Sequence, residues 1–118
     1  MTNKQLAKYL DEFVGAEADY PFGPDALVYK VKGKMFAILA HREGREYVTL
    51  KAKPEDGEVL CAQFDDITPG YHTNKRHWVT VYYPGDVEDG FVEDLCVRSY
   101  ELVIKGLKKL ERVSLGYD

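Results

Sequence analysis

Three strand-like segments follow one another between residues 27 and 52, and they limit the possible folds most strongly. Leu27–Lys32 and Lys34–His41 are rich in β-branched and aromatic residues, and Gly33 between them predicts a tight hairpin. A second predicted turn at Arg42–Arg45 leads into a third segment, Tyr47–Ala52. Strands joined by short turns run antiparallel, so the sequence predicts an antiparallel sheet.

The third segment alternates in polarity along its length. Val48 and Leu50 point to one side of the strand, while Tyr47, Thr49 and Lys51 point to the other. This pattern is typical of an antiparallel sheet with one face on the core and one face in solvent. We therefore expect one covered face and one open face.

Helices are predicted on both sides of this region. Thr2 and Gln5 have the spacing of a capping box, and apolar residues then follow at helical intervals as far as Gly15. Pro54 at a first helical position predicts a second helix. A last helix is predicted after Asp86, which we expect to cap it, and one side of this helix is apolar. The expected buried residues are Leu6, Tyr9, Leu10, Phe13 and Val14 in the first helix, Val59, Leu60 and Phe64 in the second, and Val92, Leu95, Cys96, Val103, Leu107 and Leu110 in the last.

The remaining segments predict a loop and a further strand. Ala16–Asp25 contains two prolines and a glycine and is predicted to be a loop, with Tyr20 and Phe22 folded back onto the core. A strand is expected from His77 to Tyr83. The order α-β-β-β-α-β-α predicts an α+β fold, an antiparallel sheet with helices packed on one face, as a single domain over residues 1–118.

Composition narrows the class of protein. The apolar fraction of 45% and the charged fraction of 31% are ordinary for a globular domain. No apolar run is long enough to span a bilayer and the first residues are polar, so we expect a cytoplasmic monomer with no membrane partner. Cys61 and Cys96 are expected to be reduced and buried, and no residue spacing suggests a metal or a cofactor.

The segment Pro69–Trp78 holds the most chemically distinctive residues. It contains two of the three histidines, Lys75, Arg76 and the only tryptophan. Aromatic faces interleaved with cations suit an anionic partner with planar rings, such as nucleic acid. Alternatively, Trp78 fills the core and the cations lie on a solvated turn.

Motifs in several parts of the chain resemble the MmcQ/YjbR family of small bacterial proteins. They are Asp19-Tyr-Pro-Phe22, Lys34-Met-Phe36, Leu50-Lys51, Pro69-Gly-Tyr-His72, Asn74-Lys-Arg-His-Trp78 and Ser99-Tyr100. The resemblance implies an α+β sandwich related to the frataxin-like (CyaY-like) fold. It also implies DNA binding through a "double wing" of strands, formed here by Lys30–Met35 and His72–Tyr83.

A set of basic, aromatic and amide side chains is thus the candidate DNA-binding site. These residues are Lys30, Lys32, Lys34, Lys51, His72, Asn74, Lys75, Arg76 and Trp78. The net charge of −4 argues against binding by the whole surface, because affinity for polyanions comes from lysine and arginine. Lysines on an edge hairpin also discourage strands from pairing between molecules, which is the alternative role for the first three.

Other functions are weighed against DNA binding. A protein- or small-ligand-binding domain could use the open sheet face, where Tyr29, Tyr47, Tyr82 and Tyr83 would supply recognition surface. The acidic residues Asp86, Glu88, Asp89, Glu93 and Asp94 are interpreted as a solvated helix start and not as a cation site. No nucleophile is paired with a base in any catalytic motif. His72 with Tyr71 or Asp66 could act as general acid and base, but only proximity in sequence supports this, so we expect no enzyme activity.

Overall fold

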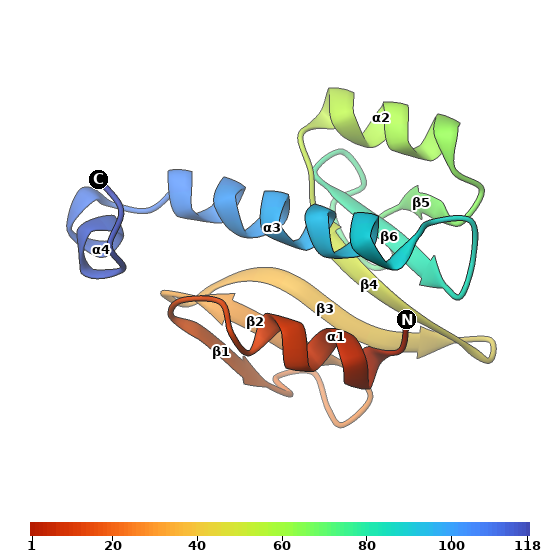
Figure 1. Ribbon diagram of the computed structural model, residues 1–118, viewed down its shortest axis with the longest axis horizontal. Coiled ribbons are helices and arrows are strands. Elements are labelled where there is room, and N and C mark those ends of the chain that lie inside the picture. Colours follow the sequence, from red (N-terminus) through yellow and green to blue (C-terminus); the bar gives the residue numbers. More distant parts are fainter.

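Two hairpins form the centre of a six-stranded antiparallel sheet in the computed structural model, which describes all 118 residues. The strand order is β1-β2-β3-β4-β6-β5 (Figure 1). The strands are β1 (Ala16–Asp19), β2 (Leu27–Val31), β3 (Lys34–Arg42), β4 (Arg45–Lys51), β5 (Ile67–Pro69) and β6 (Trp78–Tyr83). The predicted antiparallel sheet is confirmed.

Both hairpin turns have backbone torsions that match the twist of the strands. Lys32 and Gly33 have φ of 51° and 78°, and Glu43 and Gly44 have φ of 52° and 79°. Positive φ at both central residues is the mark of the tight turn that favours right-twisted hairpins. Glycine adopts this conformation without strain, so each turn places it second.

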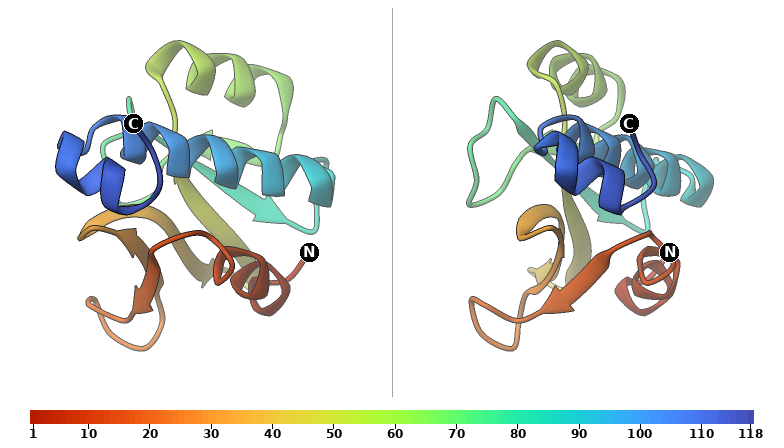
Figure 2. Two further views of the ribbon diagram at one scale, coloured as in Figure 1. Left: turned by 60° about the vertical axis from the view of Figure 1, so that its left-hand side comes forward. Right: turned by 90° about the vertical axis from the view of Figure 1, so that its left-hand side faces the viewer.

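Four helices accompany the sheet: α1 (Asn3–Leu10), α2 (Pro54–Gln63), α3 (Asp89–Lys105) and α4 (Lys109–Ser114). The long α3 packs across β2, β3 and β4, with α1 beside it, and α2 contacts β5 and β6 at one edge (Figures 1 and 2). The α+β class is therefore confirmed. No helix combines the length and the apolar character needed to cross a membrane.

The core lies between the sheet and α1 and α3. Its 22-residue cluster includes Tyr29 and Phe36 from the strands and Leu95 and Tyr100 from α3. The Thr2–Gln5 capping box is present as predicted. Both cysteines are free thiols; Cys96 is buried as expected, but Cys61 is only half-buried, because one side of α2 faces solvent.

Several local predictions are wrong at the N-terminal end. The first helix ends at Leu10, and turns carry the chain on to Ala16. Residues 16–19 form the edge strand β1 and not a loop, since pairing with β2 supplies the backbone partners that local propensity does not predict. Tyr20 and Phe22 are 56% and 69% exposed, so they do not plug the core.

The other corrections concern helix faces and caps. Val14, Val59 and Leu110 are exposed. The last helix stops at Lys105, and Leu110 belongs to the separate α4, whose residues are all at least partly exposed. Asp86 does not cap α3: its carboxylate instead accepts hydrogen bonds from the amides of Asp65 and Asp66.

Candidate nucleic-acid interface on the open sheet face

The sheet face opposite α1 and α3, which we call the open face, carries the alternate residues of β4 and β6. Thr49 pairs with Thr80, and Lys51 pairs with Trp78. Val48 and Leu50 lie in the core cluster as predicted, but Tyr47 and Thr49 on the other side of β4 are buried as well, so the expected exposure of that side is wrong for the middle of the strand. Side chains that are paired across neighbouring strands project from the same face, which places the Lys51–Trp78 pair at one end of it.

The segment between β5 and β6, residues 70–77, folds over the middle of the open face. The amide of Tyr71 donates to Oγ1 of Thr80 (2.9 Å), and the hydroxyls of Thr80 and Thr49 are 2.8 Å apart. Both threonines are almost fully buried. In Figure 2 this segment projects on the side away from α3. We refer to residues 70–77 as the β5–β6 loop.

Gly70 allows the loop to close tightly. A Cβ at this position would clash with Oγ1 of Thr73 and would lie 2.7 Å from Cβ of Trp78 and 3.0 Å from the Trp78 carbonyl oxygen. The amide of Gly70 also donates to that carbonyl. A side chain here would force the loop away from the start of β6.

The cations and aromatic rings of the loop are held in different ways. Nζ of Lys75 donates to the Gly70 carbonyl (3.0 Å), while Arg76 has an exposed side chain. The Asn74 side chain accepts from the Arg76 amide (3.0 Å), so Asn74 stabilises the turn. His72 has φ of 59°, and its ring lies 3.9 Å from that of Tyr71.

Lys51 and Trp78 form a cation–aromatic pair at the end of the sheet where the loop joins β6. Nζ of Lys51 lies 6.0 Å from the centre of the Trp78 ring. The tryptophan is half-buried, so it does not fill the core and one side of it meets solvent. This pair joins a cation to a ring that could stack on a base.

The predicted hairpin lysines do not converge on this face. Tyr29 is in the core and pairs with Ala37, which also pairs with Leu50. One residue further along each strand, Lys30 and Lys51 therefore lie on the open face, on either side of β3. Lys34 pairs with the core residue Val31, which puts it on the opposite face, and Lys32 lies in the turn.

Sequence reasoning missed a cluster of arginines and tyrosines at the other end of the open face. The Arg42 guanidinium lies 4.2 Å from the Tyr71 ring centre, and its Nη1 donates to the Tyr82 hydroxyl at 3.4 Å. The Tyr47 ring packs edge-on against Tyr71 and Tyr82. The pair of arginines beside the Glu43-Gly44 turn was the available signal.

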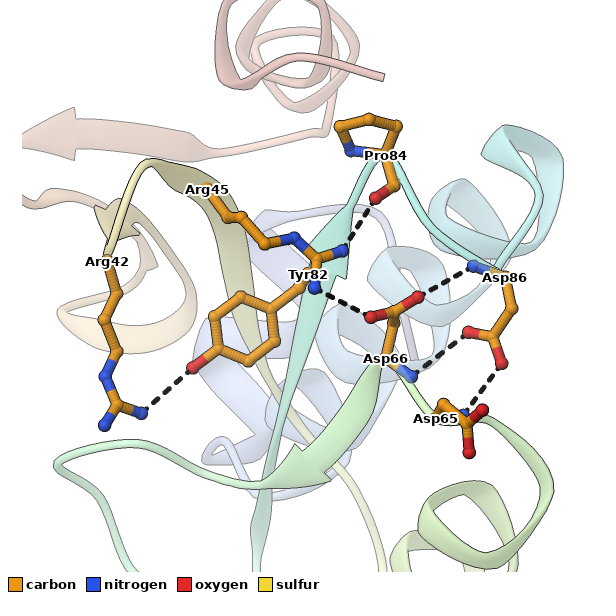
Figure 3. A network of polar contacts seen from close by, with 7 residues as sticks. All are labelled: Arg42, Arg45, Asp65, Asp66, Tyr82, Pro84 and Asp86. Carbon is orange, nitrogen blue, oxygen red and sulfur yellow. Dashed lines mark hydrogen bonds and ion pairs between the residues drawn. The ribbon is translucent and has the colours of Figure 1, made fainter.

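Arg45 holds this end of the sheet to the α2–β5 turn. Its Nη1 lies 2.8 Å from Oδ1 of Asp66, and its Nη2 donates to the Pro84 carbonyl (Figure 3). The other carboxylate oxygen of Asp66 accepts from the Asp86 amide. The hydrogen bond from Arg45, and then that from Asp86, holds the pKa of the Asp66 carboxyl below its ordinary value.

Two hollows flank Pro69, and Lys75 lines both. One, of about 310 Å³, lies between α2 and the loop and includes Cys61 and Arg76 in its lining. The other, of about 520 Å³, lies beside the Arg42–Tyr82 cluster. The alternative surface of four tyrosines does not exist: Tyr29 and Tyr83 belong to the core cluster, Tyr47 is buried and only Tyr82 is partly exposed.

Comparison with known proteins identifies the family. The family model described as YjbR matches residues 11–102, most of the chain. The chain belongs to the YjbR family. It is 36% identical to YbdF of Escherichia coli O157:H7 (94% of this chain, 88% of the relative) and 35% identical to YjbR of Escherichia coli K12 (95% of both).

Solved structures of two other proteins share the fold. The crystal structure of Deinococcus radiodurans protein DR2400, with domain DUF419, superposes with a TM-score of 0.89 at 38% identity, covering 99% of this chain and 89% of the other. A Pseudomonas syringae protein gives a TM-score of 0.77 at 27% identity over 86% of this chain and 98% of its own. The YjbR resemblance noted in the sequence is confirmed.

Proposed function

We propose that this YjbR-family protein binds DNA as a single strand laid across the Trp78 end of the open face. The observation that carries this proposal is the half-exposed Trp78 ring with Lys51 beside it and the exposed Arg76 close by in the chain. A stacking ring with flanking cations is the arrangement that holds single strands without sequence preference.

The positions of the lysines favour a strand running across the sheet. Lys30 on β2, Lys51 on β4 and Trp78 on β6 form one row, and three strand spacings make it about 15 Å long. Lys75 and Arg76 lie in the loop that leads into Trp78 and line the hollow beside α2. The uneven distribution of cations explains how a protein of net charge −4 could hold a polyanion: local potential matters more than net charge.

The proposed role is binding without a catalytic step. Burial raises the pKa of both cysteine thiols, which keeps them protonated and poorly nucleophilic. His72 and His77 are exposed and have no carboxylate partner to orient them as a base. An exposed ring beside a row of cations, without an activated nucleophile or base, is typical of a binding module.

Salt dependence of binding provides the test. Contacts from Lys30, Lys51, Lys75 and Arg76 to four phosphates predict a slope of about −2.8 for log affinity against log salt. Affinity for a short oligothymidine should therefore fall about 50-fold between 50 and 200 mM salt. Fluorescence of Trp78, the only tryptophan, should be quenched as bases stack on it.

Matched charge variants make the test specific to this face. Lys51→Gln with Arg76→Gln should reduce the slope by about 1.4, because two phosphate contacts are lost. Lys105→Gln with Lys108→Gln removes the same charge near the far end of α3 and should leave the slope unchanged. A slope near zero, or equal slopes for the two double variants, contradicts the proposal.

A further inference from the structure

The larger hollow beside Pro69 has the dimensions of a small-molecule site. Its volume of about 520 Å³ lies within the range of such sites. The β3–β4 hairpin, the α2–β5 turn, the β5–β6 loop and β6 all contribute to its lining. Segments far apart in sequence thus meet around one concave surface, on the end of the open face away from Trp78.

Charges inside this hollow are only partly neutralised by one another. Arg45 and Asp66 form an ion pair at 2.8 Å. Arg42 and Lys75 have no carboxylate partner, and the carboxylates of Glu43 and Asp65 have no cationic one. Figure 3 shows the hydrogen bond from the Arg42 guanidinium to the Tyr82 hydroxyl and the ion pair between Arg45 and Asp66. The hollow therefore offers free cations and free carboxylates together.

The Arg42 side chain is positioned before any ligand arrives. Its guanidinium lies 4.2 Å from the centre of the Tyr71 ring and donates one long hydrogen bond to Tyr82. The other N–H groups are free, and a planar guanidinium binds phosphate through two parallel hydrogen bonds. Because contacts with two rings restrict the side chain, less conformational entropy is lost when an anion binds.

We propose that this hollow binds a nucleotide through its phosphate, either as a free mononucleotide or as the 5′-phosphorylated end of a DNA strand. Arg42 and Lys75 hold the phosphate, and the carboxylate of Asp65 or Glu43 accepts hydrogen bonds from the amino group of a base. Only the strand-end form rests on the proposed function. Lys75 also lines the groove that contains Arg76, so a terminal nucleotide here is continuous with the proposed strand path.

Calorimetric titration with five probes tests the proposal: deoxyadenosine monophosphate, deoxyadenosine, inorganic phosphate, and an oligodeoxyadenosine with and without its 5′-phosphate. The monophosphate should bind at least tenfold more tightly than the nucleoside or inorganic phosphate. Arg42→Gln should remove at least tenfold of that affinity, and Arg42→Lys should restore only part of it, because lysine lacks the planar fork. The control Lys105→Gln removes an exposed charge at the far end of α3 and should change nothing.

The outcomes separate this proposal from strand binding in general. Equal affinity for the nucleoside and its monophosphate, equal affinity for inorganic phosphate, or an unchanged Arg42→Gln variant overturns it. If the monophosphate binds but a 5′-phosphate does not raise the affinity of the oligonucleotide, the ligand of this hollow is a free nucleotide and not a strand end. If the monophosphate binds and no oligonucleotide does, the nucleotide site is supported and the proposed DNA binding is refuted. Arg42 is exposed, so its variants should fold normally.

Discussion

Replacing Ser99 by alanine should destabilise the protein, because it removes a buried hydroxyl group that makes two hydrogen bonds. Ser99 lies on α3 and is fully buried. Its Oγ donates to the carbonyl of Phe36 at 2.6 Å and accepts from the amide of Lys51 at 2.9 Å. One hydroxyl thus satisfies a backbone group on each of β3 and β4, next to the Ala37–Leu50 pair at which the β3–β4 pairing ends.

The magnitude follows from the two backbone groups that would lose their partner. A buried polar group left without a hydrogen bond costs about 1–3 kcal/mol. The Phe36 carbonyl is buried and would stay without a partner. Lys51 is half-buried, so water can partly replace the hydrogen bond that its amide loses. We therefore expect a loss of about 3 kcal/mol in the free energy of unfolding. With an unfolding entropy of about 2.1 cal/mol/K per residue, Tm should fall by about 12 °C.

Urea denaturation followed by circular dichroism, with Ser114→Ala as the control, measures this loss. The Ser114 hydroxyl donates to a carbonyl within exposed α4, so its removal should change the free energy of unfolding by less than about 0.5 kcal/mol. If Ser99→Ala is as stable as Ser114→Ala, with the same denaturant slope, the bridging role of Ser99 is refuted.

Three further predictions concern the loop, the ion pair and the thiols. Gly70→Ala should shift the emission of Trp78 and destabilise the protein, because the new Cβ would lie 2.7 Å from that of Trp78; an unchanged spectrum would show that the loop has room. Asp66→Asn should cost about 1 kcal/mol at pH 7, measured by urea denaturation. The pKa of Asp66 is lowered in the folded state, so its contribution is present above the unfolded pKa and lost as pH falls through the folded one. The cost should therefore be smaller in acid than at pH 7, and a cost that does not change with pH would exclude the Arg45 pair as its cause. Cys96 should not react with a thiol reagent at pH 8 unless urea is added, since burial raises its pKa, and rapid reaction of the native protein would contradict that burial.

The central strands could be predicted from the sequence because their signals are local. Gly33 and Gly44 mark turns that need positive φ, and the alternation around Val48 follows directly from the side-chain period of a strand. Strand β1 could not be predicted, because its residues become a strand only by pairing with β2, a contact made within the tertiary structure. The exposure of Leu110 follows from the helix ending at Lys105, a boundary that apolar spacing alone extends too far.

The candidate site was predictable in composition but not in arrangement. Trp78, Lys75 and Arg76 stand out in the sequence, and the structure brings Tyr71 of the same loop over the open face while Lys75 and Arg76 line the hollow beside α2. Two features could be found only in the structure. The strand register places Lys30 and Lys34 on opposite faces of the sheet, and the path of the chain brings Tyr71 beside Arg42 and Tyr82. Hydrogen bonds between side-chain hydroxyl groups, such as that between Thr49 and Thr80, join strands that are distant in sequence.

Mapping of backbone amide shifts by NMR, on titration with a short unphosphorylated oligothymidine, tests the central claim most directly. A chain of 118 residues is small enough for every amide to be followed. Binding to the open face predicts shifts confined to β4, β6, the β5–β6 loop and the neighbourhood of Lys30, and these shifts should disappear at high salt. Shifts on the outer surface of α3 or α1, or none at low salt, would contradict the claim that the open face binds DNA.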